Sequence, residues 1–293
     1  MLASAELYRL DKIPSNIKPA TFDRGRSAAL QIQAEGDEFG CSATIISNQG
    51  HVLTALHCLA QCVKFTEGKS VKSFRFTMPD QQQIRSGKAN CKLPFAQEGK
   101  KFGSLAVQVV AAGAGYVFAT DTENLKKELD KNPDRRAAFS QLIEAGVGIT
   151  GDYAILRVPG LAGRSCAKTS ARTASVNESV WNIGYPDTRS GAVFSPGRVS
   201  FAPVGKVDST VTSGQQGANL VMRRTGALIT SIEAHPGSSG SGVVSYQGDL
   251  VGLVNAAGTK AGSSSFGSSI SYIVSTATVN YGSAVVASAF NCQ

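Results

Sequence analysis

Short runs of aliphatic and β-branched residues recur along this chain and are separated by turns rich in Gly, Ser and Asn. Such runs are typical of β-strands, because β-branched side chains pack well on a pleated surface. The clearest runs are residues 30–32, 74–77, 105–111, 180–183, 220–222 and 250–254. With 293 residues, of which 42% are hydrophobic, the chain has room for one large domain or two small ones. The pattern predicts an all-β fold.

One stretch of small residues, 236–242, has the sequence Pro-Gly-Ser-Ser-Gly-Ser-Gly and leads into an apolar run. Ser239 has Gly237 two positions before it and another glycine directly after it. The earlier glycine can turn its N–H toward a developing oxyanion, and the later one lets a substrate carbonyl approach. Most Gly/Ser-rich loops are only flexible turns. Because Ser238 and Ser241 lack the earlier glycine, Ser239 is the candidate nucleophile.

A serine nucleophile needs a general base, and the chain has three histidines, His51, His57 and His235. His57 ends the apolar run 52–56, where a strand would deliver it to a loop. His51 follows the turn sequence Asn-Gln-Gly, and we expect it to have a structural role. His235 shares a short loop with Ser239, too close along the chain to approach its hydroxyl easily. His57 is therefore the candidate base.

A third group must hold the base in one tautomer. Asp152 follows a glycine and opens the mostly apolar segment 153–158, as an acid at the head of a buried strand would. In isolation, an aspartate at such a place is more often an ordinary turn residue. Its assignment therefore depends on the order of the three motifs along the chain.

That order is His, Asp, Ser: Thr-Ala-Leu-His-Cys at 54–58, Asp-Tyr-Ala-Ile-Leu at 152–156 and Gly-Ser-Ser-Gly-Ser at 237–241. On these motifs the chain resembles the trypsin/chymotrypsin superfamily of serine endopeptidases. The third motif is closer to the bacterial branch, with its glutamyl endopeptidases and HtrA-type protease domains, than to animal trypsins. The resemblance spans Cys41 to about Tyr272, although only the three motifs are distinctive. An α/β-hydrolase would place its histidine after the nucleophile, and no histidine follows position 239.

The resemblance implies two six-stranded antiparallel β-barrels with the active site in the cleft between them. The first barrel would carry His57 and Asp152, and the second would carry Ser239. The N–H groups of Gly237 and Ser239 would form the oxyanion hole. No cofactor is implied.

We expect an N-terminal segment at 1–27, the first barrel at 28–160, a linker at 161–177 and the second barrel with a C-terminal helix at 178–293. The His and Asp motifs lie farther apart than in a compact trypsin. Within this excess, at about 120–146, apolar residues recur at spacings of three or four and predict a short helical insertion. It would be a lid or exosite at the rim of the cleft or, as we favour, a surface elaboration.

Six cysteines, an even number, suit an oxidising compartment. The family resemblance pairs Cys41 with Cys58, which follows the candidate base directly. The remaining four allow three connectivities, of which we favour Cys62–Cys91 and Cys166–Cys292. A metal site is not expected, because the chain has no Cys-x-x-Cys pair and no histidine at ligand spacing from the cysteines.

Substrate preference is harder to predict. In the trypsin alignment the base of the primary pocket falls at Glu233, whose carboxylate would favour Arg or Lys. The neighbouring sequence is more HtrA-like, and there this side chain need not face the pocket. Glutamyl endopeptidases have a histidine where this chain has Val254, which argues against acidic substrates. Asn255, Ala256 and Ala257 would form the edge that pairs with the substrate backbone. We favour a basic or small apolar residue before the scissile bond.

The resemblance also bears on activation. Trypsins use an aspartate just before the nucleophile to pair with a newly cleaved amino terminus. Ser238 stands there and cannot form that ion pair. We expect no zymogen switch of this kind, while a propeptide or lid stays an open alternative.

The net charge of +8 raises the question of anionic partners. Lys and Arg are scattered and no nucleic-acid recognition motif accompanies them, so no specific nucleic-acid binding is expected. Attraction to anionic surface polymers is a hypothesis. No apolar run approaches the roughly 20 residues of a membrane span. Residues 1–6 resemble the end of a signal peptide. A secreted or periplasmic monomer is expected.

The sequence thus predicts a serine endopeptidase that acts on proteins or peptides through His57, Asp152 and Ser239. The alternative from another class is a catalytically silent homologue that binds proteins or cell-wall polymers through the same scaffold. A non-peptide esterase is a lesser alternative.

Overall fold

The computed structural model describes residues 8–9, 15–33, 40–59, 61–71, 74–98, 100–113, 115–118, 151–170, 172–186, 191–202, 226–257 and 265–293. The helical insertion expected at about 120–146, the expected strand at 220–222 and the signal-like residues 1–6 lie outside these residues.

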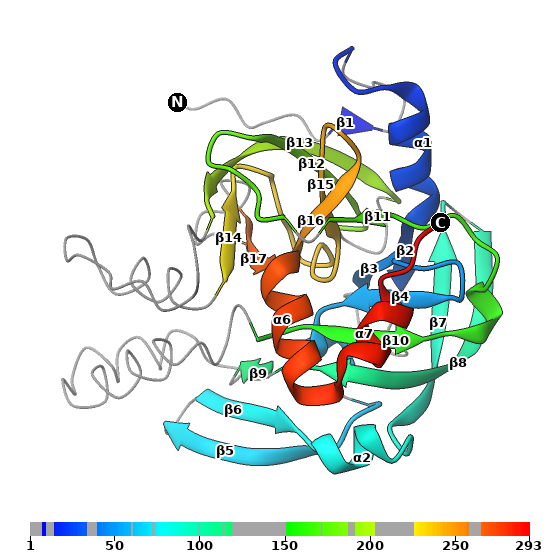
Figure 1. The fold of residues 1–293 in the computed structure, drawn as a ribbon, viewed down its shortest axis with the longest axis vertical. Helices are drawn as coiled ribbons and strands as arrows, with labels where there is room; N and C mark the ends of the chain where they lie inside the picture. The colour runs from blue at the N-terminus through cyan, green and yellow to red at the C-terminus, as the bar shows by residue number, and fades with distance from the viewer. Residues whose placement is uncertain are drawn as a thin grey trace.

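Six antiparallel strands close the first barrel in the order β10-β4-β3-β2-β7-β8 (Figure 1). They are β2 (Ala29–Ile32), β3 (Cys41–Ile45), β4 (His51–Thr54), β7 (Asn90–Gln97), β8 (Lys100–Ala112) and β10 (Ala154–Arg157). Their apolar side chains fill the interior, including the fully buried Leu30, Leu53 and Leu93. The strand expectations at 30–32 and 105–111 are confirmed.

A second ring of six antiparallel strands follows, because β13 pairs with both β12 and β14. The strands are β12 (Ser179–Gly184), β13 (Val193–Phe201), β14 (Ala227–Thr230), β15 (Gly242–Ser245), β16 (Asp249–Ala257) and β17 (Ser265–Ser269). Two short strands extend it: β1 (Tyr8–Arg9) along β13, and β11 (Lys168–Thr169) parallel to β16. The all-β prediction of two six-stranded barrels is therefore confirmed. The exact part boundaries stay a prediction.

A small sheet outside the barrels was not expected. It consists of β5 (Phe65–Val71), β6 (Phe74–Pro79) and β9 (Gly115–Phe118), with β6 in the middle. The run at 74–77 is thus a strand, but it belongs to this sheet. The short helix α2 (Gln81–Arg85) follows, and the Asp80 carboxylate caps it by accepting from Gln83 N at 3.0 Å.

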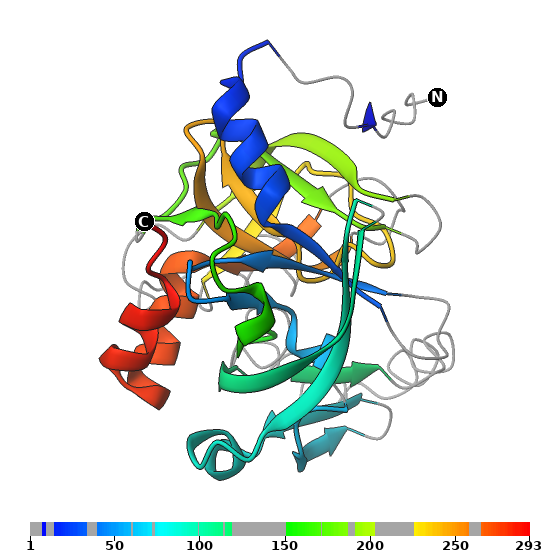
Figure 2. The same cartoon turned by 90° about the vertical axis from the view of Figure 1, so that its right-hand side faces the viewer.

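The helix α1 (Pro19–Ala28) precedes the first barrel in sequence but packs against the second (Figure 2). Pro19 suits the first turn, where its missing N–H costs nothing. Phe22 is buried against Trp181 and Phe194, with ring centroids 5.8 and 5.4 Å away. These aromatic contacts attach the N-terminal segment to the second barrel.

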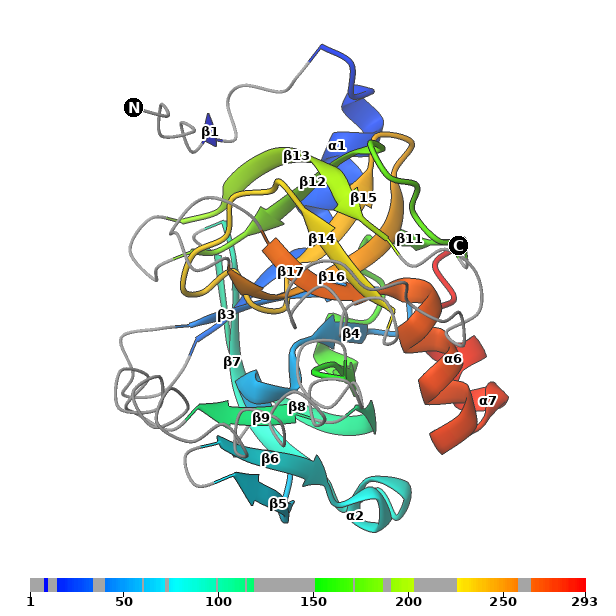
Figure 3. The ribbon, with the colours of Figure 1, turned by 90° about the vertical axis from the view of Figure 1, so that its left-hand side faces the viewer.

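Two helices end the chain and cross in the opposite direction, from the second barrel to the first (Figure 3). They are α6 (Ile270–Tyr281) and α7 (Ser283–Ala289), which confirm the expected C-terminal helix. The Tyr281 hydroxyl donates to Ala112 O of β8 at 2.9 Å, and the Tyr153 and Thr276 hydroxyls lie 3.0 Å apart. Among the described helices, none is both long and apolar enough to cross a membrane.

All six cysteines form disulfides: Cys41–Cys58, Cys62–Cys91 and Cys166–Cys292. The predicted connectivity is confirmed. The last of these bonds fixes the end of the chain to the segment between the barrels.

We predict that Phe22→Ala detaches α1 and lowers the free energy of unfolding by about 3 kcal/mol, because it leaves a cavity beside Trp181. Urea denaturation followed by the fluorescence of Trp181, the only tryptophan of the chain, measures this loss. Arg24→Ala, at an exposed position of the same helix, should change stability by less than about 0.5 kcal/mol. Equal effects of the two variants would contradict the packing role of Phe22.

Candidate functional site

The register of two neighbouring strands brings His57 and Asp152 together. Thr54 at the end of β4 pairs with Ala154 at the start of β10. Because the strands are antiparallel, the residues after Thr54 and those before Ala154 emerge at the same end of the barrel. The chain after β4 forms the 3₁₀ helix η1 (Leu56–Leu59), which carries His57. The structure thus joins two residues that sequence reasoning had placed at the ends of separate strands.

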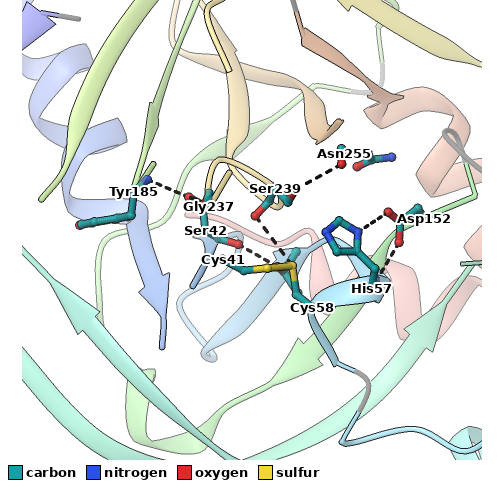
Figure 4. The surroundings of a disulfide bond; sticks show 10 residues. Cys41, Ser42, His57, Cys58, Asp152, Tyr185, Gly237, Ser239 and Asn255 are labelled. Carbon is teal, nitrogen blue, oxygen red and sulfur yellow. Dashed lines mark hydrogen bonds and ion pairs between the residues drawn. A yellow bond between two sulfur atoms is a disulfide. The ribbon is translucent and has the colours of Figure 1, made fainter. Parts of the chain in front are cut away.

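Both carboxylate oxygens of Asp152 accept hydrogen bonds from His57 (Figure 4). Oδ2 lies 2.6 Å from the ring Nδ1, and Oδ1 lies 2.9 Å from the main-chain N. The Asp152 side chain has no solvent exposure, whereas that of His57 is 28% exposed. A buried carboxylate requires such partners. The second bond, from the main chain, was not foreseen.

The electrostatics of this pair set the proton affinity of the imidazole. Burial acts to lower the pKa of His57, but the charge of Asp152 and its hydrogen bond outweigh burial and raise the pKa above its ordinary value. Because Nδ1 donates to Asp152, Nε2 is the ring nitrogen that takes up a further proton. His57 can therefore act as a base whose protonated form is stabilised.

Ser239 lies on the loop before β15, across from the first barrel. Its hydroxyl donates to the main-chain oxygen of Asn255 at 3.2 Å, and this is its one hydrogen bond in the described part of the chain. Figure 4 shows Ser239 above the Cys41–Cys58 disulfide, with the His57 ring beside it. Rotation about the Cα–Cβ bond of Ser239 can turn this hydroxyl away from Asn255.

Two glycines of the loop around Ser239 have a positive φ. Gly237 and Gly240 have φ of 92° and 90°, a region that favours glycine. Gly240 also needs to lack a side chain, since a Cβ there would lie 2.0 Å from Ser42 O. The N–H groups of Gly237 and Ser239 make no hydrogen bond with any residue that the structure describes. They remain available to an oxyanion.

The cluster Cys41, His57 and Cys58 brings three potential metal-ligand atoms within 4.8 Å of one another. The two sulfur atoms are bonded to each other, however, and a disulfide sulfur lacks the charge of the thiolate that binds zinc. The disulfide instead attaches η1 to β3, and Cys58 Sγ lies 3.9 Å from Ser239 O.

The residues expected to determine specificity occupy different environments. The Glu233 carboxylate accepts from His235 Nε2 at 2.9 Å, an ion-pairing partner that sequence reasoning had missed. The Val254 side chain is buried in the core of the second barrel. Val254 contacts the Ser239 loop through its main-chain oxygen, which accepts from Gly240 N at 2.7 Å. The Asn255 side chain is buried as well and donates to Ser268 Oγ at 3.0 Å.

Residues 255–257, which include Ala256 and Ala257, continue β16 beyond its last pair with β15, Leu253 with Gly242. Ala256 and Ala257 pair with Phe266 and Ser265 of β17. Among the described residues, no strand pairs with the other edge of Ala256 and Ala257, and such an edge can accept an added strand.

Two histidines lie outside the central pair. His51 begins β4 and is buried, with Nδ1 2.8 Å from Ser47 Oγ. Burial, and then the charge of Arg157, lower its pKa. His235 is bound to Glu233 on its own loop.

Sequence reasoning missed Ser42, Thr54 and Tyr185, which form a buried hydrogen-bond network with Gly237 of the Ser239 loop. Figure 4 shows Ser42 between Tyr185 and this loop. Ser42 directly follows Cys41, but no local pattern distinguishes it from other strand serines.

Comparisons with known proteins agree with this fold. The family described as "Trypsin-like peptidase domain" matches residues 41–253. A comparison with curated protein sequences finds no match. Among solved structures, the HtrA-type protease AlgW with a tripeptide is 16% identical, with a TM-score of 0.52, and the alignment covers 92% of this chain and 65% of that one.

Two further structures are each 14% identical, with TM-scores of 0.50. For the serine endoprotease from Yersinia pestis the coverage is 93% of this chain and 68% of that one. For the Rv3671c protease of M. tuberculosis in its inactive form, the alignment covers 92% of this chain and 100% of that one. At these identities, the structural similarity shows a shared fold.

We predict that His57 and His51 titrate separately in NMR spectra of the labelled imidazoles. His57 should titrate above the free value of about 6.5 and His51 below it. Asp152→Asn should lower the pKa of His57. The substitution removes the negative charge that raises this pKa, whereas the burial that lowers it is unchanged. A His57 signal that titrates below the free value in the unaltered protein would contradict the pairing with Asp152.

Proposed function

Because the chain belongs to the family of trypsin-like peptidases, we propose that it is a serine endopeptidase that hydrolyses peptide bonds through an acyl-enzyme. The observation that carries this proposal is the buried Asp152 carboxylate, with both oxygens bound to His57, facing the Ser239 loop. A carboxylate bound to a neutral imidazole, with a hydroxyl opposite the imidazole, is the arrangement that activates a serine.

In the proposed reaction, Ser239 Oγ attacks the scissile carbonyl while its proton passes to His57 Nε2. The N–H groups of Gly237 and Ser239 hold the oxyanion of the tetrahedral intermediate. His57 then gives the proton to the leaving amine, and the C–N bond breaks. Water attacks the resulting ester by the same route in reverse, which releases the acid and restores Ser239. Asp152 orients His57 and stabilises its charged form throughout.

The substrate would bind as an added strand along residues 255–257. Its main-chain N–H groups would then compete with Ser239 for the Asn255 carbonyl, which now accepts the Ser239 hydroxyl. Occupation of that carbonyl by substrate would release the hydroxyl toward His57. Substrate binding would in this way help to orient the Ser239 hydroxyl for attack.

The surroundings of the enzyme are part of the proposal. Three disulfides indicate an oxidising compartment, and we place the protein outside the cell or in the periplasm. Proteins or peptides are its substrates, and it acts as a monomer. Attraction to anionic polymers through its net positive charge stays a hypothesis, as does activation without a trypsin-like zymogen switch.

We predict that a fluorophosphonate adds once to the protein, on Ser239, as intact mass and peptide mapping would show. Ser239→Ala should abolish the adduct.

Asp152→Asn should slow peptide hydrolysis by about 10⁴-fold, because the imidazole loses its orientation. In the unaltered enzyme kcat/KM should rise with pH through the raised pKa of His57, since the neutral imidazole is the active form.

Ser241→Ala is the matched control. Ser241 is likewise followed by glycine, but it is buried, and its hydroxyl accepts from Asn182 Nδ2 at 2.9 Å. This variant should retain the adduct on Ser239. Folded, oxidised protein that gives no adduct would refute the enzyme and favour a catalytically silent homologue that binds proteins or cell-wall polymers.

Preference for a basic or small apolar residue before the scissile bond is also a proposal, and the Glu233–His235 pair provides its test. Glu233→Gln should lower kcat/KM for Arg and Lys substrates about 10-fold relative to an Ala substrate if the carboxylate reaches the pocket. His235→Ala should raise kcat/KM for Arg and Lys substrates relative to the Ala substrate, because the Glu233 carboxylate loses its bond to His235. A peptide library measures this preference in both variants. An unchanged ratio in both variants would remove Glu233 from the specificity pocket.

A further inference from the structure

Ser42 makes four hydrogen bonds although it has no solvent exposure. Its hydroxyl donates to Gly237 O and accepts from Tyr185 N, each at 2.8 Å. Its main-chain N donates to Ser239 O at 2.7 Å, and its main-chain O accepts from Thr54 Oγ1 at 2.8 Å. A single residue of β3 in the first barrel thus holds the carbonyls of two residues on the nucleophile loop of the second.

These bonds fix two peptide planes of the loop. The plane after Gly237 is held at its carbonyl by the Ser42 hydroxyl and at its N–H, on Ser238, by His235 O at 2.9 Å. The plane after Ser239 is held by Ser42 N and by the bond from Gly240 N to Val254 O. A rigid peptide plane held at both ends cannot turn over.

The N–H groups that would bind the oxyanion belong to two other planes, the one before Gly237 and the one before Ser239. The plane before Ser239 is held at one end, where Ser238 O accepts from Ser241 N at 3.0 Å. The plane before Gly237 has no such bond among the described residues. Gly237 resists rotation of this plane little, because glycine adopts both signs of φ. The orientation of the plane before Gly237 therefore depends on how Gly237 itself is held. The hydrogen bond from Ser42 to the Gly237 carbonyl provides that hold.

We propose that Ser42 is a positioning residue for the oxyanion hole, whose hydroxyl holds Gly237 so that the N–H groups of Gly237 and Ser239 point to one place. The inference rests on the proposed endopeptidase function. Without the hydroxyl, the buried carbonyl of Gly237 and the buried N–H of Tyr185 would both lose a partner. The loop would then leave this conformation for part of the time.

The test compares Ser42→Ala with Ser47→Ala. Ser47 is an equally buried serine of the first barrel, and its hydroxyl bonds to His51, with no contact to the nucleophile loop. Ser42→Ala should lower kcat about 10- to 100-fold with KM within about 2-fold, since the oxyanion forms only after binding. The pH at which activity rises should not move, because the His57–Asp152 pair is untouched. Ser47→Ala should leave kcat within about 2-fold.

Ser42→Thr keeps the hydroxyl and should restore most of the activity. Ser42→Gly provides a second variant without the hydroxyl if the alanine variant does not fold. The positioning role is overturned if kcat is unchanged in the hydroxyl-free variants, or if Ser47→Ala loses as much.

Amide hydrogen exchange of residues 235–241 decides the role of Ser42 independently of activity. Exchange should be faster in Ser42→Ala than in the unaltered protein and in Ser47→Ala. If the unaltered protein fails to react with a fluorophosphonate, the proposed function fails, but this exchange comparison still decides whether Ser42 holds the loop. Equal exchange in all three proteins would overturn the inference.

Discussion

The buried carboxylate of Asp152 is the constraint on which the site depends. A charge without solvent contact is costly unless both oxygens find donors, and His57 supplies both, one from its ring and one from its main chain. These donors can meet the carboxylate only if β4 and β10 keep the register that pairs Thr54 with Ala154. A slip by one residue would reverse the faces of the strand and leave the carboxylate unpaired. Barrel register and imidazole orientation are therefore a single structural requirement.

Ser239 is held near this pair by contacts between main chains of the two barrels. Gly240 lies so close to Ser42 O that no side chain fits at its position, and Ser42 N binds Ser239 O. Main-chain contacts leave little freedom, because neither side can adjust by changing a rotamer. This explains why glycine recurs around Ser239 for two separate reasons. Gly237 provides a backbone conformation, whereas Gly240 provides space as well.

The sequence predicted those features that short motifs or the family resemblance carry: the two barrels, the Cys41–Cys58 disulfide and the candidate roles of His57, Asp152 and Ser239. The other two disulfides were favoured among three connectivities that the sequence left open. It did not predict the sheet of β5, β6 and β9, because a strand pattern does not indicate which sheet a strand joins. The Ser42 network was also missed, since its partners lie 143 and 195 positions away and a buried serine has no distinctive local pattern. The Glu233–His235 pair shows another limit. Two residues apart in sequence, they were assigned separate roles, because side-chain direction on an irregular loop cannot be read from spacing.

The two ends of the chain stabilise this arrangement by crossing between the barrels. The helix α1 precedes the first barrel yet buries Phe22 against Trp181 and Phe194 of the second. The helix α6 follows the second barrel yet binds the first through Tyr281 and Ala112. Separation of the barrels would expose both contacts, so each helix opposes the opening of the interface at which Ser42 meets the nucleophile loop. The catalytic geometry proposed here needs atoms of both barrels within hydrogen-bond distance, and two crossing attachments hold that distance more firmly than the main-chain contacts of one loop could alone.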